Sequence, residues 1–216
     1  LARLESDVLD HSVALNIRRQ AVGGLCALAK HHDQWWASVV QSLLPLLNHP
    51  QQLVRQHVFE SLQTLGVTSE VLGKAALASS VQDMAAQGLK LLVSTSGVQQ
   101  AHPLLQELIQ TSDPILAVEA WKMLSADVGV VNAAAFVWQS YCLPLRSMVV
   151  QQLAERSVND PHAAELLVQA TTNDDRHSAI DAAQSLLRQA HPASVAALKQ
   201  LLTHSQEAYE QSSLIA

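Results

Sequence analysis

The stretch LLPLLNHPQQLVRQHVFESLQTLG, residues 43–66, contains two helix-like segments on either side of one turn. Apolar residues recur in both segments at spacings of three and four, which is the period of an amphipathic helix. Between them, Asn48-His49-Pro50 predicts a turn, because Asn is a good N-cap and Pro is tolerated where a helix starts. Pro45 falls inside the first segment and is expected to bend it. The stretch therefore predicts a pair of helices, A followed by B.

The B segment has a pattern that returns along the chain. Val54, Val58 and Leu62 are an apolar residue, a small or apolar residue four positions later, and Leu eight positions later. The pattern occurs six times, at spacings of 27 to 37 residues, and its first residues are Ile17, Val54, Val81, Leu116, Leu145 and Ala179. Other apolar segments lie between the occurrences, over residues 35–47, 67–78, 98–109, 128–141, 162–170 and 193–202. Helix pairs repeated at this period are typical of an α-solenoid, in which stacked pairs bury one another's apolar stripes.

Turn residues support the same division. Ser112-Asp113-Pro114 and Asn173-Asp174-Asp175 lie between an A and a B segment, and Asn159-Asp160-Pro161 precedes a later A segment. All three contain residues that cap helix N-termini. No run of alternating β-branched and polar residues predicts a strand. We therefore expect an all-α fold.

The ends and the composition set limits on the class of protein. The chain begins at Leu1 and stops at Ala216 within an apparent structural unit, so we expect a fragment of a longer protein. No signal peptide pattern opens it. Residues 128–145 lack charges, but polar residues and a proline interrupt them, which favours a buried helix over a membrane span. Cys26 and Cys142 lie in apolar helical contexts, are too few for a disulfide framework, and favour the reducing cytoplasm.

Residues 43–66 resemble a HEAT repeat. The resemblance rests on the proline-containing A helix, the turn ending in Pro50, the Val54-Arg55 pair and the Leu62/Leu65 stripe, and residues 17–29 resemble the B helix of another repeat. It implies a single domain over residues 1–216, folded as a right-handed α-solenoid of about six stacked helix pairs. Proteins of this family mostly act as scaffolds and adaptors, whereas a minority bind or modify nucleic acid or act on tetrapyrrole cofactors.

The resemblance also implies a role for one arginine of the pattern. Arg18, Arg55 and Arg146 follow the first pattern residue, where the other units have Gln82, Ala117 and Ile180. In HEAT repeats this arginine usually bonds to neighbouring turns and helix ends. A ligand-binding arginine ladder is the alternative.

Candidate partner-binding residues follow from the helix period. If the pattern residues face the core, residues two, six and nine positions later lie on the opposite side of each B helix. Four of the residues selected in this way are basic and three are acidic, and several are Gln. They are Arg19, Gln56, Glu60, Gln63, Asp83, Gln87, Lys90, Lys122, Gln151, Asp181 and Arg188. This mixed surface suits contacts with protein better than a phosphate-tracking groove, which needs a basic stripe.

Two further features have a functional and a structural interpretation. His31-His32-Asp33 followed by Trp35-Trp36 could form a metal or ligand site, but adjacent His residues rarely point at one ion. The sequence therefore favours an N-cap at Asp33, with one Trp in the core and the other at the surface. Phe59 and Trp121 occupy the same position of their units, which indicates packing between helices, although an exposed Trp would be a good partner-binding anchor.

No catalytic signature is present: the sequence contains no Gly-rich phosphate loop, H-E-x-x-H, C-x-x-C or G-x-S-x-G motif. The net charge of −6 disfavours a dominant nucleic-acid surface. We therefore expect no catalytic residues, metal or cofactor, and no membrane association. The leading hypothesis is an interaction scaffold or adaptor whose partner is a protein or another domain of its own chain. The alternatives are a nucleic-acid-binding or base-modifying HEAT-like protein and a purely structural spacer.

Overall fold

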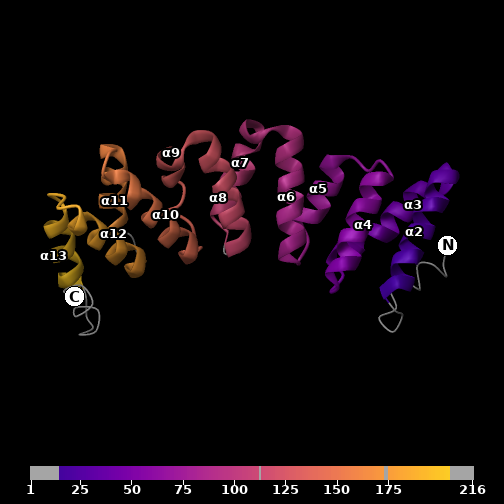
Figure 1. Ribbon diagram of the computed structural model, residues 1–216, viewed down its shortest axis with the longest axis horizontal. Helices are drawn as coiled ribbons and strands as arrows, with labels where there is room; N and C mark the ends of the chain where they lie inside the picture. The colour runs from indigo at the N-terminus through magenta and orange to yellow at the C-terminus, as the bar shows by residue number, and fades with distance from the viewer. Residues whose placement is uncertain (1–14, 112, 173–174, 205–216) are drawn as a thin grey trace. The chain divides into compact units, whose positions relative to one another are not determined.

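The computed structural model describes residues 15–111, 113–172 and 175–204, apart from the side chains of residues 200, 203 and 204. Every regular element within these ranges is a helix, which confirms the all-α prediction (Figure 1). In chain order they are α2 (Leu15–His31), α3 (Asp33–Leu43), the 3-10 helix η1 (Leu44–Asn48), α4 (Gln52–Thr64), α5 (Ser69–Leu77), α6 (Gln82–Ser96), α7 (Val98–Ile109), α8 (Pro114–Val128), α9 (Val130–Ala134), α10 (Leu143–Ser157), α11 (Pro161–Ala170), α12 (Arg176–Arg188) and α13 (Ser194–His204).

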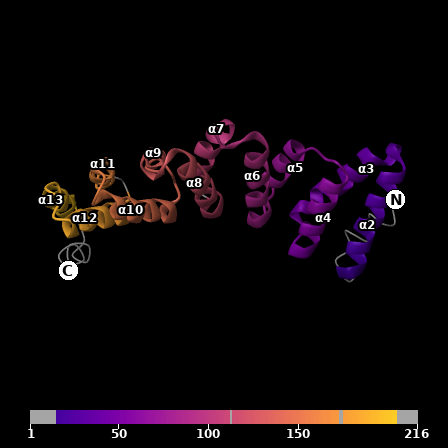
Figure 2. The same cartoon turned by 45° about the horizontal axis from the view of Figure 1, so that its top comes forward.

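The contacts between residues divide the chain into two compact units. We call Leu1–Ala101 unit 1 and His102–Ala216 unit 2. In unit 1, α2 packs on α3 and α4, η1 packs on α4, and α5 packs closely on α6. In unit 2, α10 lies against α8, α11 and α12, and α12 also contacts α13 (Figure 2). Helices adjacent in sequence are thus neighbours within each unit. The single domain over residues 1–216 stays a prediction.

The repeated pattern marks the core side of the B helices. All six residues at its second position are buried, and those of α4, α8, α10 and α12 are Val58, Ala120, Val149 and Ala183. Two other pattern residues differ from the prediction: Ile17 is 45% exposed and Leu187 is 48% exposed. A residue eight positions along a helix is rotated by about 80° beyond two full turns, so it does not lie directly above the first residue. In α12 the buried stripe follows Ser178, Ala182 and Leu186, so Leu187 falls beyond its edge.

The A helix expected over residues 128–141 is wrong in its extent. α8 continues to Val128, Gly129 ends it with φ +85°, and α9 stops after five residues at Ala134. The following residues form turns in which Val137 is buried, whereas Tyr141 is 79% exposed. Residues 128–145 are therefore not one buried helix, because a glycine at positive φ and a run of β-branched and aromatic residues interrupt the helical backbone.

Three of the predicted aspartate caps are confirmed. The side chains of Asp113, Asp160 and Asp175 each accept hydrogen bonds from the first backbone N–H groups of α8, α11 and α12. Asn48 does not cap α4, whose N-cap is Gln51. The Oδ1 of Asn48 instead accepts a hydrogen bond from the Ser80 backbone N–H over 2.9 Å, and so joins two successive A-to-B turns. Pro45 lies where α3 tightens into η1, so the proline marks a change of helix type.

Two serines make the same pair of bonds in different units. The Ser79 hydroxyl donates to the Leu47 carbonyl and accepts from the Val81 backbone N–H. The Ser140 hydroxyl donates to the Ile109 carbonyl and accepts from the backbone N–H two residues later. Each serine therefore joins an A-to-B turn to the C-terminal end of the A helix in the preceding helix pair, and it satisfies a terminal carbonyl there.

Two glycines determine how closely α5 and α6 approach. A methyl group on Gly88 of α6 would lie 2.4 Å from the Leu77 backbone nitrogen and 2.7 Å from the Gly73 carbonyl oxygen of α5. A methyl group on Gly73 would meet the Leu92 side chain. The backbones of the two helices are thus in direct contact, and only a residue without Cβ fits at Gly88.

Gly88→Ala and Gly23→Ala form a matched pair, because both glycines are inside helices. Gly23 of α2 has no atom within 4 Å of its would-be Cβ, so Gly23→Ala is expected to stabilise unit 1 by roughly 0.5–1 kcal/mol. Gly88→Ala meets backbone atoms and is expected to destabilise the unit by about 1–3 kcal/mol despite the better helix propensity. Thermal unfolding followed by circular dichroism measures both. Equal shifts in Tm would contradict the close approach of α5 and α6.

Candidate functional site

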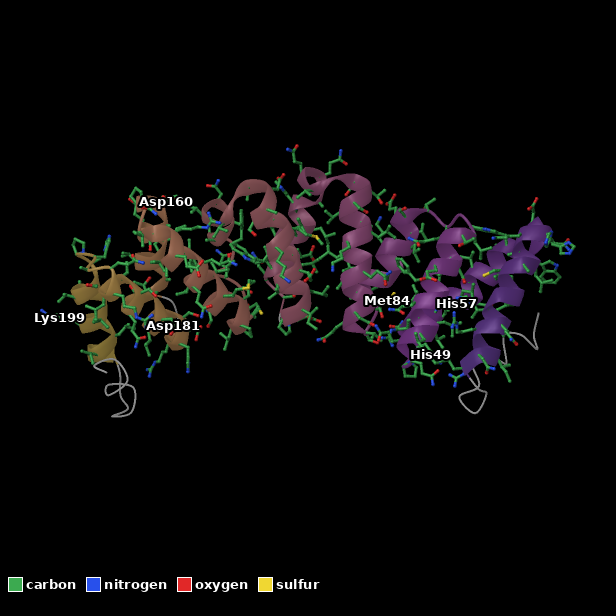
Figure 3. All side chains as sticks on the ribbon, viewed as in Figure 1. His49, His57, Met84, Asp160, Asp181 and Lys199 are labelled. Carbon is green, nitrogen blue, oxygen red and sulfur yellow. The ribbon has the colours of Figure 1, made fainter. Side chains whose placement is uncertain are left out.

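The side chains predicted to bind a partner lie outward on the B helices. We call these eleven residues the B-helix surface. Ten of them are exposed and Gln87 is partly buried, so the core-facing pattern did select the opposite side of each helix. Unit 1 contains Arg19 on α2, Gln56, Glu60 and Gln63 on α4, and Asp83, Gln87 and Lys90 on α6. Unit 2 contains Lys122 on α8, Gln151 on α10, and Asp181 and Arg188 on α12 (Asp181 is labelled in Figure 3).

The cations of this surface do not form a stripe within either unit. In unit 1, Arg19 and Lys90 are on α2 and α6, and α4 lies between these helices (Figure 1). In unit 2, Lys122 and Arg188 are on α8 and α12, and α10 contacts both of these helices. The intervening helices contribute only Gln and Glu to the surface. The basic residues are therefore interrupted in each unit by neutral or acidic side chains.

Asp83 and Lys122 of the B-helix surface each form an ion pair. Asp83 Oδ2 accepts from Arg55 Nη2 over 2.6 Å. Lys122 Nζ lies 2.9 Å from Glu119 Oε1, three residues earlier on the same helix. Asp83 is therefore a structural residue as well as an exposed one, since its carboxylate joins α6 to α4.

Arg55 connects three segments of unit 1. Its guanidinium is buried and donates to the His49 carbonyl over 2.7 Å, to the Pro50 carbonyl over 2.9 Å, and to Asp83 on α6. Arg18 is buried in the same way on α2, and its Nη1 lies 3.1 Å from His49 Nε2 (His49 is labelled in Figure 3). These two arginines bond neighbouring turns, as the resemblance implied. Arg146 on α10 is partly buried.

The histidine and tryptophan segment differs from the expectation. The N-cap of α3 is His32, without a side-chain hydrogen bond, and Asp33 is the first residue of the helix. Trp35 and Trp36 are 39% and 38% exposed, so neither is a core residue. Trp36 Nε1 nevertheless donates to the Leu65 carbonyl at the end of α4 over 2.9 Å. The prediction of one buried Trp is wrong because this indole lies over a helix end and donates a hydrogen bond there.

Phe59 and Trp121 are both buried, which confirms the packing interpretation. Among the described residues, no three His, Cys, Asp or Glu side chains form a group that could hold a metal ion. Cys26 and Cys142 are buried free thiols. Burial raises the pKa of the Cys26 thiol, while a hydrogen bond with Ser61 and the charge of Lys30 act in the opposite direction. Cys26 therefore has a core thiol rather than an activated nucleophile.

Unit 2 contains a cleft that sequence reasoning missed. It has a volume of about 420 Å³ and lies beside the C-terminal halves of α8 and α10, with the start of α9 in its wall. Trp121, Lys122 and Ser125 line it from α8, and Gln152, Glu155 and Arg156 line it from α10. Of these residues, the sequence selected only Lys122 for the B-helix surface. Trp121 was singled out for its position in the repeat, and the remaining residues were missed because their convergence depends on how two helices cross, which spacing within one helix does not show.

No protein-family model matches the chain, and a comparison with curated proteins found no similar sequence. Within the described residues, no helix combines the length and the apolar character that crossing a membrane requires.

Arg55→Met is expected to destabilise unit 1 by about 2–4 kcal/mol, because two turn carbonyls and Asp83 lose their donor. Arg19→Met is the matched control, since Arg19 is exposed and its loss should change stability by less than about 0.5 kcal/mol. Urea unfolding followed by circular dichroism compares the two variants. Equal unfolding midpoints would show that the buried arginine is not a structural tie.

Cys26 is expected to react slowly with iodoacetamide in the folded protein, because alkylation needs the thiolate and burial raises the thiol pKa. A Cys142→Ala background isolates this thiol. At pH 8 the folded variant should be modified at least about tenfold more slowly than the same variant in urea. The raised pKa also means that stability falls as pH rises through the ordinary thiol value of 9.0, since the unfolded chain loses this proton first. Equal labelling rates in the folded and unfolded states would contradict this prediction.

Proposed function

We propose that this chain is a protein-interaction module: a HEAT-like, right-handed α-solenoid of about six helix pairs that serves as a scaffold or adaptor. The B-helix surface carries the proposal. Its side chains are polar, and ten of the eleven are exposed. Within each unit, exposed residues on successive B helices offer a partner several contact points, as repeat proteins do.

The charge distribution supports a protein partner. Acidic and basic residues alternate with Gln on this surface, and the whole chain has a net charge of −6. Affinity for nucleic acid depends on several clustered cations that release counterions from phosphates. Mixed charges instead steer and orient a protein of complementary pattern. The partner is another protein or another domain of the same longer chain, and a cytoplasmic location suits the free thiols.

Charge reversal on the B-helix surface tests this proposal. Glu60→Lys on α4 and Asp181→Lys on α12 each change an exposed carboxylate of the surface. Glu70→Lys on α5 and Glu165→Lys on α11 are the matched controls, because they make the same change at exposed positions of A helices in the same units. We expect either surface variant to weaken binding of a protein partner roughly five- to tenfold, which corresponds to about 1–1.4 kcal/mol. The controls should bind as the original chain does.

The measurement uses the immobilised chain and a nuclease-treated extract, followed by titration of the purified bound protein against all four variants. Retention of a protein that the surface variants release and the controls keep supports the proposal. If nuclease treatment releases everything bound and purified RNA or DNA binds with a steep salt dependence, the nucleic-acid alternative replaces it. If the surface and control variants bind the partner equally well, the B-helix surface is not the interface.

A further inference from the structure

His49 lies buried in the turn between η1 and α4 of unit 1. Its side chain is 5% exposed, whereas the other histidines whose side chains the structure describes are partly or fully exposed. Arg55 donates to the carbonyls of His49 and Pro50 in the same turn, and it also bonds Asp83 of α6. A change in the charge of His49 would therefore act where contacts join α2, α4 and α6.

Both ring nitrogens of His49 face N–H donors. The Gln51 backbone N–H donates to Nδ1 over 3.1 Å, and Nη1 of the Arg18 guanidinium lies 3.1 Å from Nε2. A neutral imidazole has one nitrogen that accepts and one that donates, so either neutral form accepts one of these two hydrogen bonds. An imidazolium carries a proton on both nitrogens and accepts neither. Protonation of His49 therefore leaves both donors facing N–H groups.

The charges at this turn also oppose an imidazolium. Arg18 of α2 and Arg55 of α4 are buried cations, and Asp83 of α6 is the carboxylate that bonds Arg55. Apart from the Cys26 thiol and the partly buried His57, the other titratable residues of α2 to α6 are exposed, and they are Arg19, Lys30, His31, Asp33, Glu60, Glu70, Lys74 and Lys90. A positive charge on His49 would add to two buried guanidinium groups and one carboxylate, so burial and like charge both disfavour it.

We propose that His49 makes unit 1 sensitive to acid: its protonation releases the turn between η1 and α4 from Arg18 and loosens the packing of α2 on α4. The unfolded chain takes up this proton at the ordinary histidine value of about 6.5, whereas the folded turn excludes it. Because the unfolded state binds more protons, the stability of unit 1 falls as the pH drops through that value. This device requires no partner, so it goes beyond the proposed function.

Urea unfolding of the ¹⁵N-labelled chain at two pH values, one unit above and one unit below the ordinary histidine value, tests this proposal. The amide NMR signals of α2 and α4 report on unit 1. The variant His49→Asn does not titrate, and its side-chain oxygen can still accept from the backbone N–H two residues later, as in an Asx turn. On going to the lower pH, the equilibrium constant for unfolding of unit 1 should rise about tenfold more in the original chain than in His49→Asn.

His57→Asn is the matched control in the same unit (His49 and His57 are both labelled in Figure 3). His57 is only partly buried on α4, and its Nε2 lies 3.2 Å from the Arg19 carbonyl oxygen. A carbonyl accepts a hydrogen bond from a protonated ring as well as from a neutral one, so acid does not remove this contact. His57→Asn should therefore keep the acid response of the original chain.

The ring Cε1–H signal of His49 in the original chain gives a second measurement. In urea this signal should shift with a midpoint at about pH 6.5, whereas in the folded chain it should stay at its neutral position at the lower of the two pH values. Equal titration in the folded and unfolded states overturns the proposal, as does an acid response of His49→Asn that equals that of the original chain. If His49→Asn does not fold at the higher pH, the ring signal alone decides.

Discussion

Burial of one apolar stripe against the next helix is the constraint on which this structure depends. A helix such as α4 has Val58 and Leu62 on one side and polar residues on the other, so it cannot exclude water from its apolar side alone. Each unit meets this requirement by packing helices on their neighbours along the sequence. Small residues on the inner side, and the bare backbone at Gly88, let adjacent helices approach closely. The same arrangement leaves most side chains on the outer side of the B helices exposed.

Polar contacts at the turns fix the register that the apolar stripes leave loose. Hydrophobic contacts are non-directional, so they tolerate small shifts of one helix along another. Arg55 removes that freedom in unit 1, because its guanidinium bonds two turn carbonyls and a carboxylate on α6 at once. Ser79 and Ser140 repeat a smaller version of this device. The same side chains therefore donate hydrogen bonds to backbone carbonyls at the helix ends and join consecutive turns.

The polar surfaces differ in how they relate to this framework. The B-helix surface is a consequence of amphipathicity, and it occurs wherever a helix has an inner stripe. The cleft of unit 2 lies where the helix pattern is irregular, since α9 ends after five residues between α8 and α10.

The sequence alone determined the helical class, most helix positions and the exposed side of the B helices, because these follow from local periodicity and capping. Residues 98–109 and the caps Asp113, Asp160 and Asp175 needed no distant contact to be identified. Only the tertiary structure decided where α9 stops, that Trp36 bonds the end of α4, and that Arg55 joins α4 to α6. These features depend on which distant atoms meet, and spacing along one helix contains no information about the angle at which two helices cross.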